Sequence, residues 1–307
     1  MGLIQKIKNE NFTWVNITKP NTGSIEYLKQ NYKFHPLDLE DCSNPTLRAK
    51  LDEYGDYLFI ILNFPVFNRR TRRISLSEID IFIGKNYLIT LTNGDLTPLN
   101  EIFEASQLSV KNKEKYLNED VTFLLYEILN SLQKYCFPII DHVSHDLRDI
   151  EKQIFDNREK EMVREILITK RNIVNYRKSI QSHKNVIKKL SKMSHKDFMK
   201  NELNIYFASI LDQAKEIWEI LENLKENVEA VHNTNESLIS FKLNQVMKVL
   251  TSISVILLPA TLLASIFGMN YLIPFQFKAY GFWFAVGVMF LFMMFLFIYF
   301  KKKKWMD

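Results

Sequence analysis

Hydrophobic and polar positions follow a strand-like pattern in the first 112 residues of the 307-residue chain. Segments rich in β-branched and aromatic residues predict strands there. The clearest are TWVNI (13–17), YLFIILNFPVF (57–67), SEIDIFI (77–83) and NYLITL (86–91). Gly84, Lys85 and Asn86 predict a hairpin turn between the last two. We therefore expect a mixed α/β region at the start of the chain.

The middle of the chain has a helical pattern instead. It contains neither glycine nor proline between Pro138 and Pro259, which predicts almost pure helix. Apolar residues recur there at steps of three or four and form one continuous face. They are Val121, Leu125, Ile128, Leu132, Cys136, Ile139, Val143, Leu147, Ile150 and Ile154. Pro138 predicts a kink in this helix, and the polar stretch 191–201 predicts a turn after it.

A heptad pattern begins at about Asn201. Its two columns of apolar residues are Phe207, Ala214, Leu221 and Val228, and Ile210, Ile217, Leu224, Val231 and Leu238. The pattern continues without a breaker into an apolar run, so it predicts one helix of about 65 residues, roughly 100 Å long. Because a single stalk helix cannot bury such a seam alone, we expect partner helices and an oligomer.

Two uncharged runs, 249–277 and 279–300, close the pattern. A membrane span needs about 20 mostly apolar residues, and both runs are long enough. The second has aromatic residues near both ends, as interfacial belts favour. Two buried core helices are the alternative, but adjacent runs of this length are rare in soluble cores. The pattern therefore predicts two membrane spans in contact with lipid.

The charge distribution supports this interpretation. The formal net charge is +5, yet seven lysines and one acid follow Glu236, so residues 1–236 carry a net charge of −1. A surplus confined to the flanks of apolar runs is typical of membrane proteins and disfavours nucleic-acid binding. The KKKKW segment at 301–305 predicts a cytoplasmic C-terminus. With two spans, the N-terminal region is also expected inside, at the cell membrane; MGLIQKIKNE has no apolar signal-peptide core.

Catalytic chemistry finds little support in the sequence. The two cysteines lie far apart, which excludes a disulfide scaffold, and no phosphate loop or nucleophile motif is present. His142 and His145 lie among acidic residues at helical spacing. A metal site there is one interpretation, and a solvated acidic face is favoured. No enzyme and no cofactor are predicted.

A mixed stripe of polar and apolar residues at helical spacing leads into and along the first apolar run. The stripe consists of Asn244, Met247, Leu250, Ser254, Leu258, Thr261 and Ser265. One interpretation is that the hydroxyl groups bond carbonyls of their own helix or hold helices together. The other is a pore lining, with hydrophobic constrictions at Met247, Leu250 and Leu258.

The run ends in Gly268, Met269 and Asn270. A Gly-Met-Asn motif that closes the first of two C-terminal spans, with a lysine-rich tail after the second, resembles the CorA family of divalent-cation channels. VMKVLTSISVILLPATLLASIFGMN is similar to the family's pore helix, and YFKKKKW to its C-terminus. WVNI and FHPLDLEDCSNPTLRAKLDEYGDYLFIIL are similar to its N-terminal half, so the resemblance covers essentially the whole chain.

The resemblance implies a homopentameric funnel. Five first membrane helices would surround the pore, and Gly268, Met269 and Asn270 would form the selectivity filter. Asn270 would then place five amide groups at the outer mouth, where they can accept hydrogen bonds from the waters of hydrated Mg²⁺. Mg²⁺ would be both the transported ion and a regulatory ion, the latter bound between subunits by Asp95 and Asp212.

Two segments depart from the family pattern. The loop after the motif reads YLIPFQFKAY and has no acid, with Gln276 where the family has a glutamate. In the stalk, Ser209 stands where the family often has an aspartate, and Asp212 follows one helical turn later.

The expected organisation is an α+β cytoplasmic domain, long helices and a two-span membrane domain. Its parts are an α/β domain at 1–112, antiparallel helices at 113–200, a stalk helix at 201–248, a first membrane helix with the motif at 249–270, an extracellular loop at 271–278, a second membrane helix at 279–300 and a basic tail at 301–307. The expected function is Mg²⁺ uptake, with Co²⁺ and Ni²⁺, driven by the membrane potential. A zinc-type transporter of the same superfamily and a non-conducting, membrane-anchored sensor are the alternatives.

Overall fold

The computed structural model describes residues 3–45, 48–117, 120–193, 204–269 and 279–303. It divides into two compact units, Met1–His232 and Asn233–Asp307. The division falls inside one long helix. The finer boundaries expected from the sequence remain predictions.

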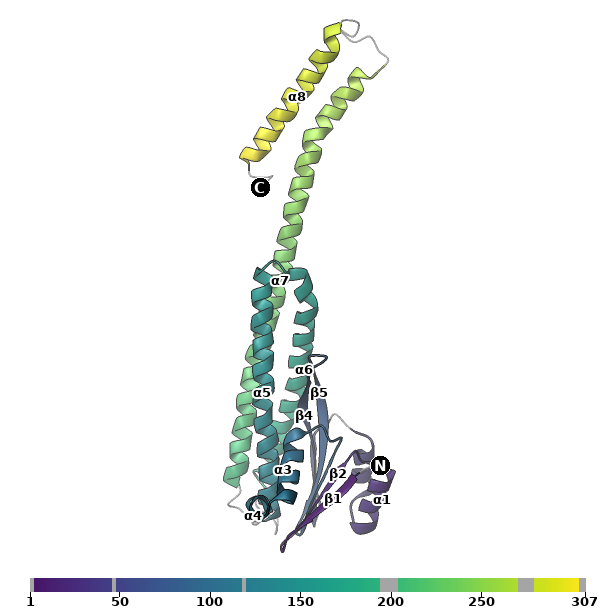
Figure 1. Ribbon diagram of the computed structural model, residues 1–307, viewed down its shortest axis with the longest axis vertical. Helices are drawn as coiled ribbons and strands as arrows, with labels where there is room; N and C mark the ends of the chain where they lie inside the picture. The colour runs from purple at the N-terminus through teal and green to yellow at the C-terminus, as the bar shows by residue number, and fades with distance from the viewer. Residues whose placement is uncertain (1–2, 46–47, 118–119, 194–203, 270–278, 304–307) are drawn as a thin grey trace. The chain divides into compact units, whose positions relative to one another are not determined.

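A six-stranded sheet forms the centre of the first unit (Figure 1). Its strands are β1 (Leu3–Lys8), β2 (Thr13–Thr18), β3 (Lys50–Glu53), β4 (Tyr57–Asn68), β5 (Arg73–Gly84) and β6 (Tyr87–Thr92), in the order β1-β2-β6-β5-β4-β3. All neighbours are antiparallel except the parallel pair β2 and β6. Gly84 pairs with Tyr87 in the predicted hairpin. The four predicted strands are confirmed, and the two that the sequence did not predict, β1 and β3, are the edges.

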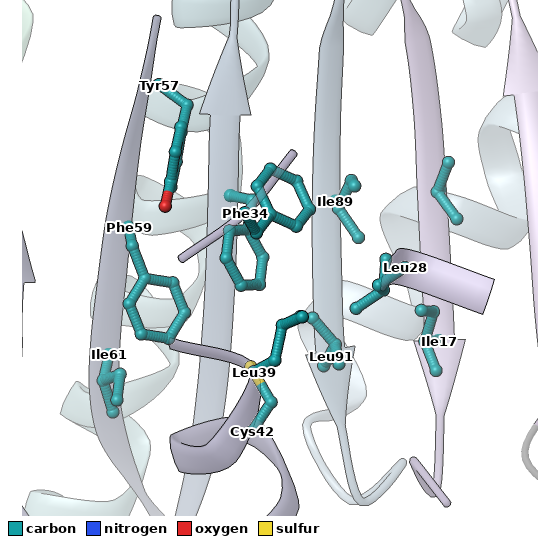
Figure 2. Packing of buried hydrophobic residues seen from close by; sticks show 12 residues of the cluster. Ile17, Leu28, Phe34, Leu39, Cys42, Tyr57, Phe59, Ile61, Ile89 and Leu91 are labelled. Carbon is teal, nitrogen blue, oxygen red and sulfur yellow. The ribbon is translucent and has the colours of Figure 1, made fainter. Parts of the chain in front are cut away.

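Helices cover both faces of the sheet. On one face α1 (Thr22–Asn31), α2 (Pro36–Ser43) and the segment between them pack against the strands. Figure 2 shows this packing, with Leu28, Phe34 and Leu39 set against Phe59 and the other labelled strand residues. On the other face lie α3 (Thr97–Leu108), α5 (Val121–Phe155) and α6 (Glu159–Leu190), and α4 (Val110–Leu117) precedes α5. Strand β4 is covered on both sides, because every residue from Leu58 to Leu62 is buried.

The continuous face predicted for α5 is confirmed. All ten of its apolar residues are buried, and the helix continues through Pro138. The long helix α7 (Asn204–Phe267) has 64 residues, close to the predicted length. The last helix, α8 (Ala279–Lys302), corresponds to the second apolar run.

The heptad seam of α7 is buried within the chain itself. Its eight residues from Phe207 to Val231 are all buried, and only Leu238 is half-buried. Contacts to α5 and α6 explain this burial. Tyr126 of α5 packs against Phe207 with ring centroids 6.5 Å apart, and Gln213 Nε2 donates to Asn130 Oδ1 over 3.1 Å. The expectation that the seam needs partner subunits is therefore wrong. A heptad pattern shows that a face is covered but not which helices cover it.

Candidate ion pathway and metal-sensing residues

The second unit contains the C-terminal part of α7 and the whole of α8. Most of its apolar side chains are exposed. The apolar windows of the two helices have mean hydropathies of 2.2 and 2.4, and only 6% of each window is buried. A soluble protein rarely exposes so large an apolar surface. The length and composition of both helices fit membrane spans.

The two faces of this part of α7 differ in burial. The less exposed face has a fully buried Ser252, followed by half-buried Ile256, Pro259, Ala260 and Leu263. These positions recur at steps of three, four and one, so they share one side of the helix.

The predicted stripe lies on the opposite face. All seven of its residues, from Asn244 to Ser265, are exposed, with Leu250 at 56% and Leu258 at 66%. Leu258 follows Ile256 by two positions, which places the two side chains about 200° apart around the helix. The stripe is therefore free to face other copies of the chain, lipid or water.

Two hydroxyl groups of the stripe bond their own helix. Ser254 Oγ donates to Leu250 O and Thr261 Oγ1 donates to Leu257 O, each over 3.0 Å. This is the back-bonding expected of hydroxyl side chains in an apolar helix. It engages the hydroxyl hydrogen and leaves oxygen lone pairs exposed as acceptors. The waters of a hydrated cation are hydrogen-bond donors, so these two oxygens suit such an ion chemically.

The helix ends where the motif begins. Gly268 N–H donates to Ala264 O over 2.9 Å, and Met269 N–H donates to Ile266 O over 3.2 Å, so the last turn tightens. A Cβ at Gly268 would lie 3.3 Å from Ala264 O, which is closer than most such contacts. Asn270 lies outside the described residues.

The two predicted sensor acids are both exposed. Asp95 lies between β6 and α3 and accepts a hydrogen bond from the Ser77 hydroxyl. Asp212 lies on α7 and forms a 2.8 Å ion pair with Lys215. Ser209, one turn earlier, is exposed as well. Within the described parts of the chain, no group of three or more His, Cys, Asp or Glu side chains is arranged to hold a metal ion. The implied site lies between subunits, so a single chain positions each acid but not the pair.

His142 and Asp146 of α5 contact other residues of the first unit. His142 stacks on Phe67, with ring centroids 5.4 Å apart, and Asp146 forms a 2.7 Å ion pair with Arg72. These contacts hold α5 against strand β4 and the turn that follows it.

Charged contacts between α6 and α7 were not predicted from the sequence. Arg177 pairs with Glu222, and Lys170 pairs with Glu229 over 2.8 Å. Arg177 also lies 5.0 Å from the ring centroid of Trp218. A signal for these contacts exists, because residues 166–196 contain no acid whereas the buried half of α7 is rich in glutamate. Opposite charge on neighbouring long helices indicates pairing.

Two buried ionisable groups lie in the first unit. Burial raises the pKa of Asp80 well above its ordinary value, and the charge of nearby Glu78 acts in the same direction. Burial lowers the pKa of His183 to about 4, although a hydrogen bond to Asn63 O opposes this shift. His183 is therefore neutral at physiological pH. Neither group belongs to the exposed stripe.

Comparisons with known proteins agree on one family. The family model described as CorA-like Mg²⁺ transporter protein matches residues 9–302. The cobalt/magnesium transport protein CorA of Thermotoga maritima is 27% identical over 298 residues, which are 96% of this chain and 83% of that protein. The complete structure of the CorA magnesium transporter from Methanocaldococcus jannaschii matches with a TM-score of 0.83 at 20% identity, covering 97% of this chain and 93% of that one. The ZntB cytoplasmic domain from Vibrio parahaemolyticus matches less well, with a TM-score of 0.58 at 13% identity over 78% of this chain and 99% of that one.

Proposed function

Since the chain belongs to the CorA-like Mg²⁺ transporter family, we propose that it forms a homopentameric channel for hydrated divalent cations. Members of this family are transporters and not enzymes. The preferred ion is Mg²⁺, with Co²⁺ and Ni²⁺ as further substrates, and uptake is directed into the cell. Both termini lie in the cytoplasm. The name of the Thermotoga relative, a cobalt/magnesium transport protein, supports Mg²⁺ and Co²⁺ as substrates.

The exposed stripe of α7 is the observation that carries the proposal. A helix in lipid gains nothing from an exposed line of amide and hydroxyl groups, because lipid tails cannot bond them. In a ring of five chains this line faces a shared axis, where water and ions can bond it. The neighbouring Met247, Leu250 and Leu258 then form apolar rings that close the path by dewetting.

The membrane potential supplies the driving force. Moving two charges through 100 mV releases about 4.6 kcal/mol, so inward transport needs no coupled hydrolysis. Mg²⁺ loses its waters reluctantly, which favours a path lined by neutral acceptors. The amide oxygens of Asn270 and the hydroxyl oxygens of Ser254 and Thr261 are such acceptors.

Ion flux into proteoliposomes tests the proposal. The full chain is reconstituted and the entry of Mg²⁺, Co²⁺, Ni²⁺ and Zn²⁺ is compared with that into protein-free vesicles. We expect an inside-negative potential to accelerate Mg²⁺ entry, and Co²⁺ and Ni²⁺ to follow the same path. No flux of any ion above the protein-free rate would contradict the proposal.

The filter is tested by Asn270→Ala. Loss of the amide removes the acceptor for the ion's waters, so flux should fall to near the background while light scattering still shows a pentamer in detergent. Unchanged Mg²⁺ flux would remove Asn270 from the mechanism. If the parent protein is a monomer or dimer at micromolar concentration, the proposed pentamer is wrong.

Internal Mg²⁺ closes the channel in this proposal, through Asp95 and Asp212 of neighbouring subunits. Hard cations prefer carboxylate oxygens, and Ser209 leaves this site one carboxylate short of the family pattern. Closure should therefore need more Mg²⁺ than in relatives with both acids. Protease protection of the stalk, titrated with Mg²⁺, should shift to higher concentration in Asp95→Asn and Asp212→Asn. Equal midpoints in the parent and both variants would place the sensor elsewhere.

Zinc transport is the second candidate. The fold likeness to the ZntB cytoplasmic domain supports it. Met269 disfavours it, because zinc-type relatives are expected to carry another residue at that position. The same flux assay separates the two candidates, since a zinc transporter would carry Zn²⁺ in preference to Mg²⁺.

A further inference from the structure

A cavity of about 490 Å³ lies in the first unit, between strand β3 and the C-terminal turns of α6. Ala49, Leu51 and Val186 form its apolar walls. Three exposed lysines, Lys188, Lys189 and Lys192, also line it, and we call them the rim lysines. The cavity thus combines apolar residues with concentrated positive charge. The volume falls within the range of about 300–1,000 Å³ that small ligands occupy.

The three rim lysines share one face of the helix end. Positions 185, 188, 189 and 192 are spaced as neighbours on a helix surface, and Asn185 adds an amide to the same face. Among the residues that the structure describes, no acidic side chain forms an ion pair with any of the three lysines. Other basic groups of α6 are engaged, since Lys170 pairs with Glu229 and Arg177 with Glu222. Within the described residues, the charge of these lysines therefore has no acidic partner.

Lys50 also borders the cavity but adds no free charge to it. Its Nζ lies 2.6 Å from Asp41 Oδ2 and 2.6 Å from Asp52 Oδ2, and these carboxylates neutralise it. The positive charge available to a ligand thus comes from Lys188 and Lys189 at the end of α6 and from Lys192 just beyond it.

Helix capping does not explain the rim lysines. Lysine near a helix C-terminus is favoured by about 0.3–1 kcal/mol through the helix dipole. The last carbonyl groups of α6 are already bonded, because Ser191 N–H donates to Ile187 O and Met193 N–H donates to Leu190 O. Lys192 also lies beyond the helix end at Leu190. Helix capping therefore does not explain why three lysines gather around one cavity.

The sheet edge contributes a further donor. Strand β3 is the edge of the sheet, paired only with β4. Tyr54 N–H donates to Tyr57 O, and antiparallel pairs alternate between hydrogen-bonded and non-bonded positions. Leu51 stands three residues earlier, at a non-bonded position, so the register turns its backbone N–H toward the open edge. A backbone N–H beside three lysines suits an anion.

We propose that this cavity binds a soluble polyphosphate, such as the triphosphate chain of a nucleotide. Three lysines with no ion pair among the described residues exceed the charge that a single phosphate would balance, and the volume of the cavity exceeds that of one phosphate. Lysine binds phosphate oxygens as a flexible point charge. The apolar wall of Leu51 and Val186 can cover the uncharged part of such a ligand. The site binds without hydrolysis and is independent of the proposed transport.

Calorimetry on the full chain in detergent tests the site, with ATP as the probe in Mg²⁺-free buffer of low salt. The parent should bind ATP saturably. The triple variant Lys188→Gln, Lys189→Gln, Lys192→Gln should bind about tenfold more weakly, because each exposed ion pair contributes about 0.2–1 kcal/mol. The control variant Arg171→Gln, Lys178→Gln removes two exposed charges of the same helix away from the cavity and should bind like the parent.

Three results would overturn the proposal. They are no saturable binding at about 1 mM ATP, equal weakening in the control variant, and unchanged binding in the triple variant. Tripolyphosphate serves as a second probe. Equal affinity for both probes would show that the phosphate chain alone is recognised, and tighter binding of ATP would assign the apolar wall to the nucleoside. Circular dichroism melting confirms that each variant is folded like the parent.

Discussion

The two halves of α7 have similar apolar periodicity and opposite surroundings. In the first half Ile217 and Leu221 are fully buried against the chain's own helices. In the second half Leu250 and Leu258 are 56% and 66% exposed. The same helix thus begins in a packed core and ends in a segment whose exposed apolar side chains no other described part of the single chain covers. The comparison teaches that the first unit covers its apolar side chains with its own helices, whereas the second leaves them exposed in the single chain.

The charges of the two halves differ in the same way. Glu222 and Glu229 in the first half pair with basic groups of α6. The second half has no charged residue after Lys248. Charged residues are therefore present where helices of the same chain supply partners, and they are absent from the apolar run whose length fits a membrane span.

The largest effect is expected from a matched pair of leucine truncations on this helix. Leu221→Ala leaves a cavity in a closed core and should cost about 2–5 kcal/mol of the free energy of unfolding of the first unit. Leu258→Ala should leave that unit's stability unchanged, because its side chain has no core to leave. Thermal melting followed by circular dichroism in detergent measures both. Equal losses in the two variants would break the distinction between the halves.

The next effect concerns the gate. Leu250→Ser replaces an apolar ring by a hydroxyl ring in the proposed pore, so water should enter and basal Mg²⁺ flux should rise about tenfold, equivalent to about 1.4 kcal/mol. Met247→Ser should act in the same direction. Val255→Ser, which changes an exposed apolar residue about 140° from Leu250 around the helix, serves as the control. If Leu250→Ser conducts like the parent, the stripe is a packing surface.

A smaller effect is expected in the first unit, where burial disfavours the charged form of Asp80. The folded chain holds the proton of Asp80 at pH values where the unfolded chain, with an ordinary pKa of 3.8, has lost it. The folded state then binds more protons, so stability falls as pH rises above about 4. Asp80→Asn removes this loss and should stabilise the first unit by about 1 kcal/mol at pH 7.5, or about 2–4 °C.

The pH dependence provides the control for Asp80→Asn. Near pH 4 the gain should vanish, because Asp80 is then protonated in both states. Asp56→Asn changes an exposed acid of the β3–β4 turn and should have little effect at either pH. A gain that is equal at both pH values would show that packing, rather than ionisation, explains the stabilisation.

The sequence predicted much of the fold because its patterns are long. Ten positions on α5 and four strands were identified by periodicity and residue type, and all are confirmed. Strands β1 and β3 were missed because edge strands are half solvated, so LIQKIK and KLDE carry lysines and acids that hide the alternation. The partners of the α7 seam were assigned wrongly because periodicity does not identify the covering helix. The stripe was identified from spacing, but the burial of Ser252 on the other face could not be, since serine is common on both kinds of surface.

Chemical accessibility of cysteines on α7 tests most directly whether the exposed stripe lines the ion path. The native Cys42 and Cys136 are buried, so a single introduced thiol is the reactive one. Ser254→Cys and Leu258→Cys lie on the stripe, and Ile256→Cys lies on the face covered within the unit. Each variant is reconstituted and treated with a positively charged methanethiosulfonate reagent while Mg²⁺ flux is measured. We predict that the reagent blocks flux in the two stripe variants and leaves it unchanged in Ile256→Cys. Block of Ile256→Cys alone, or of none of the three, would contradict an ion path along the stripe.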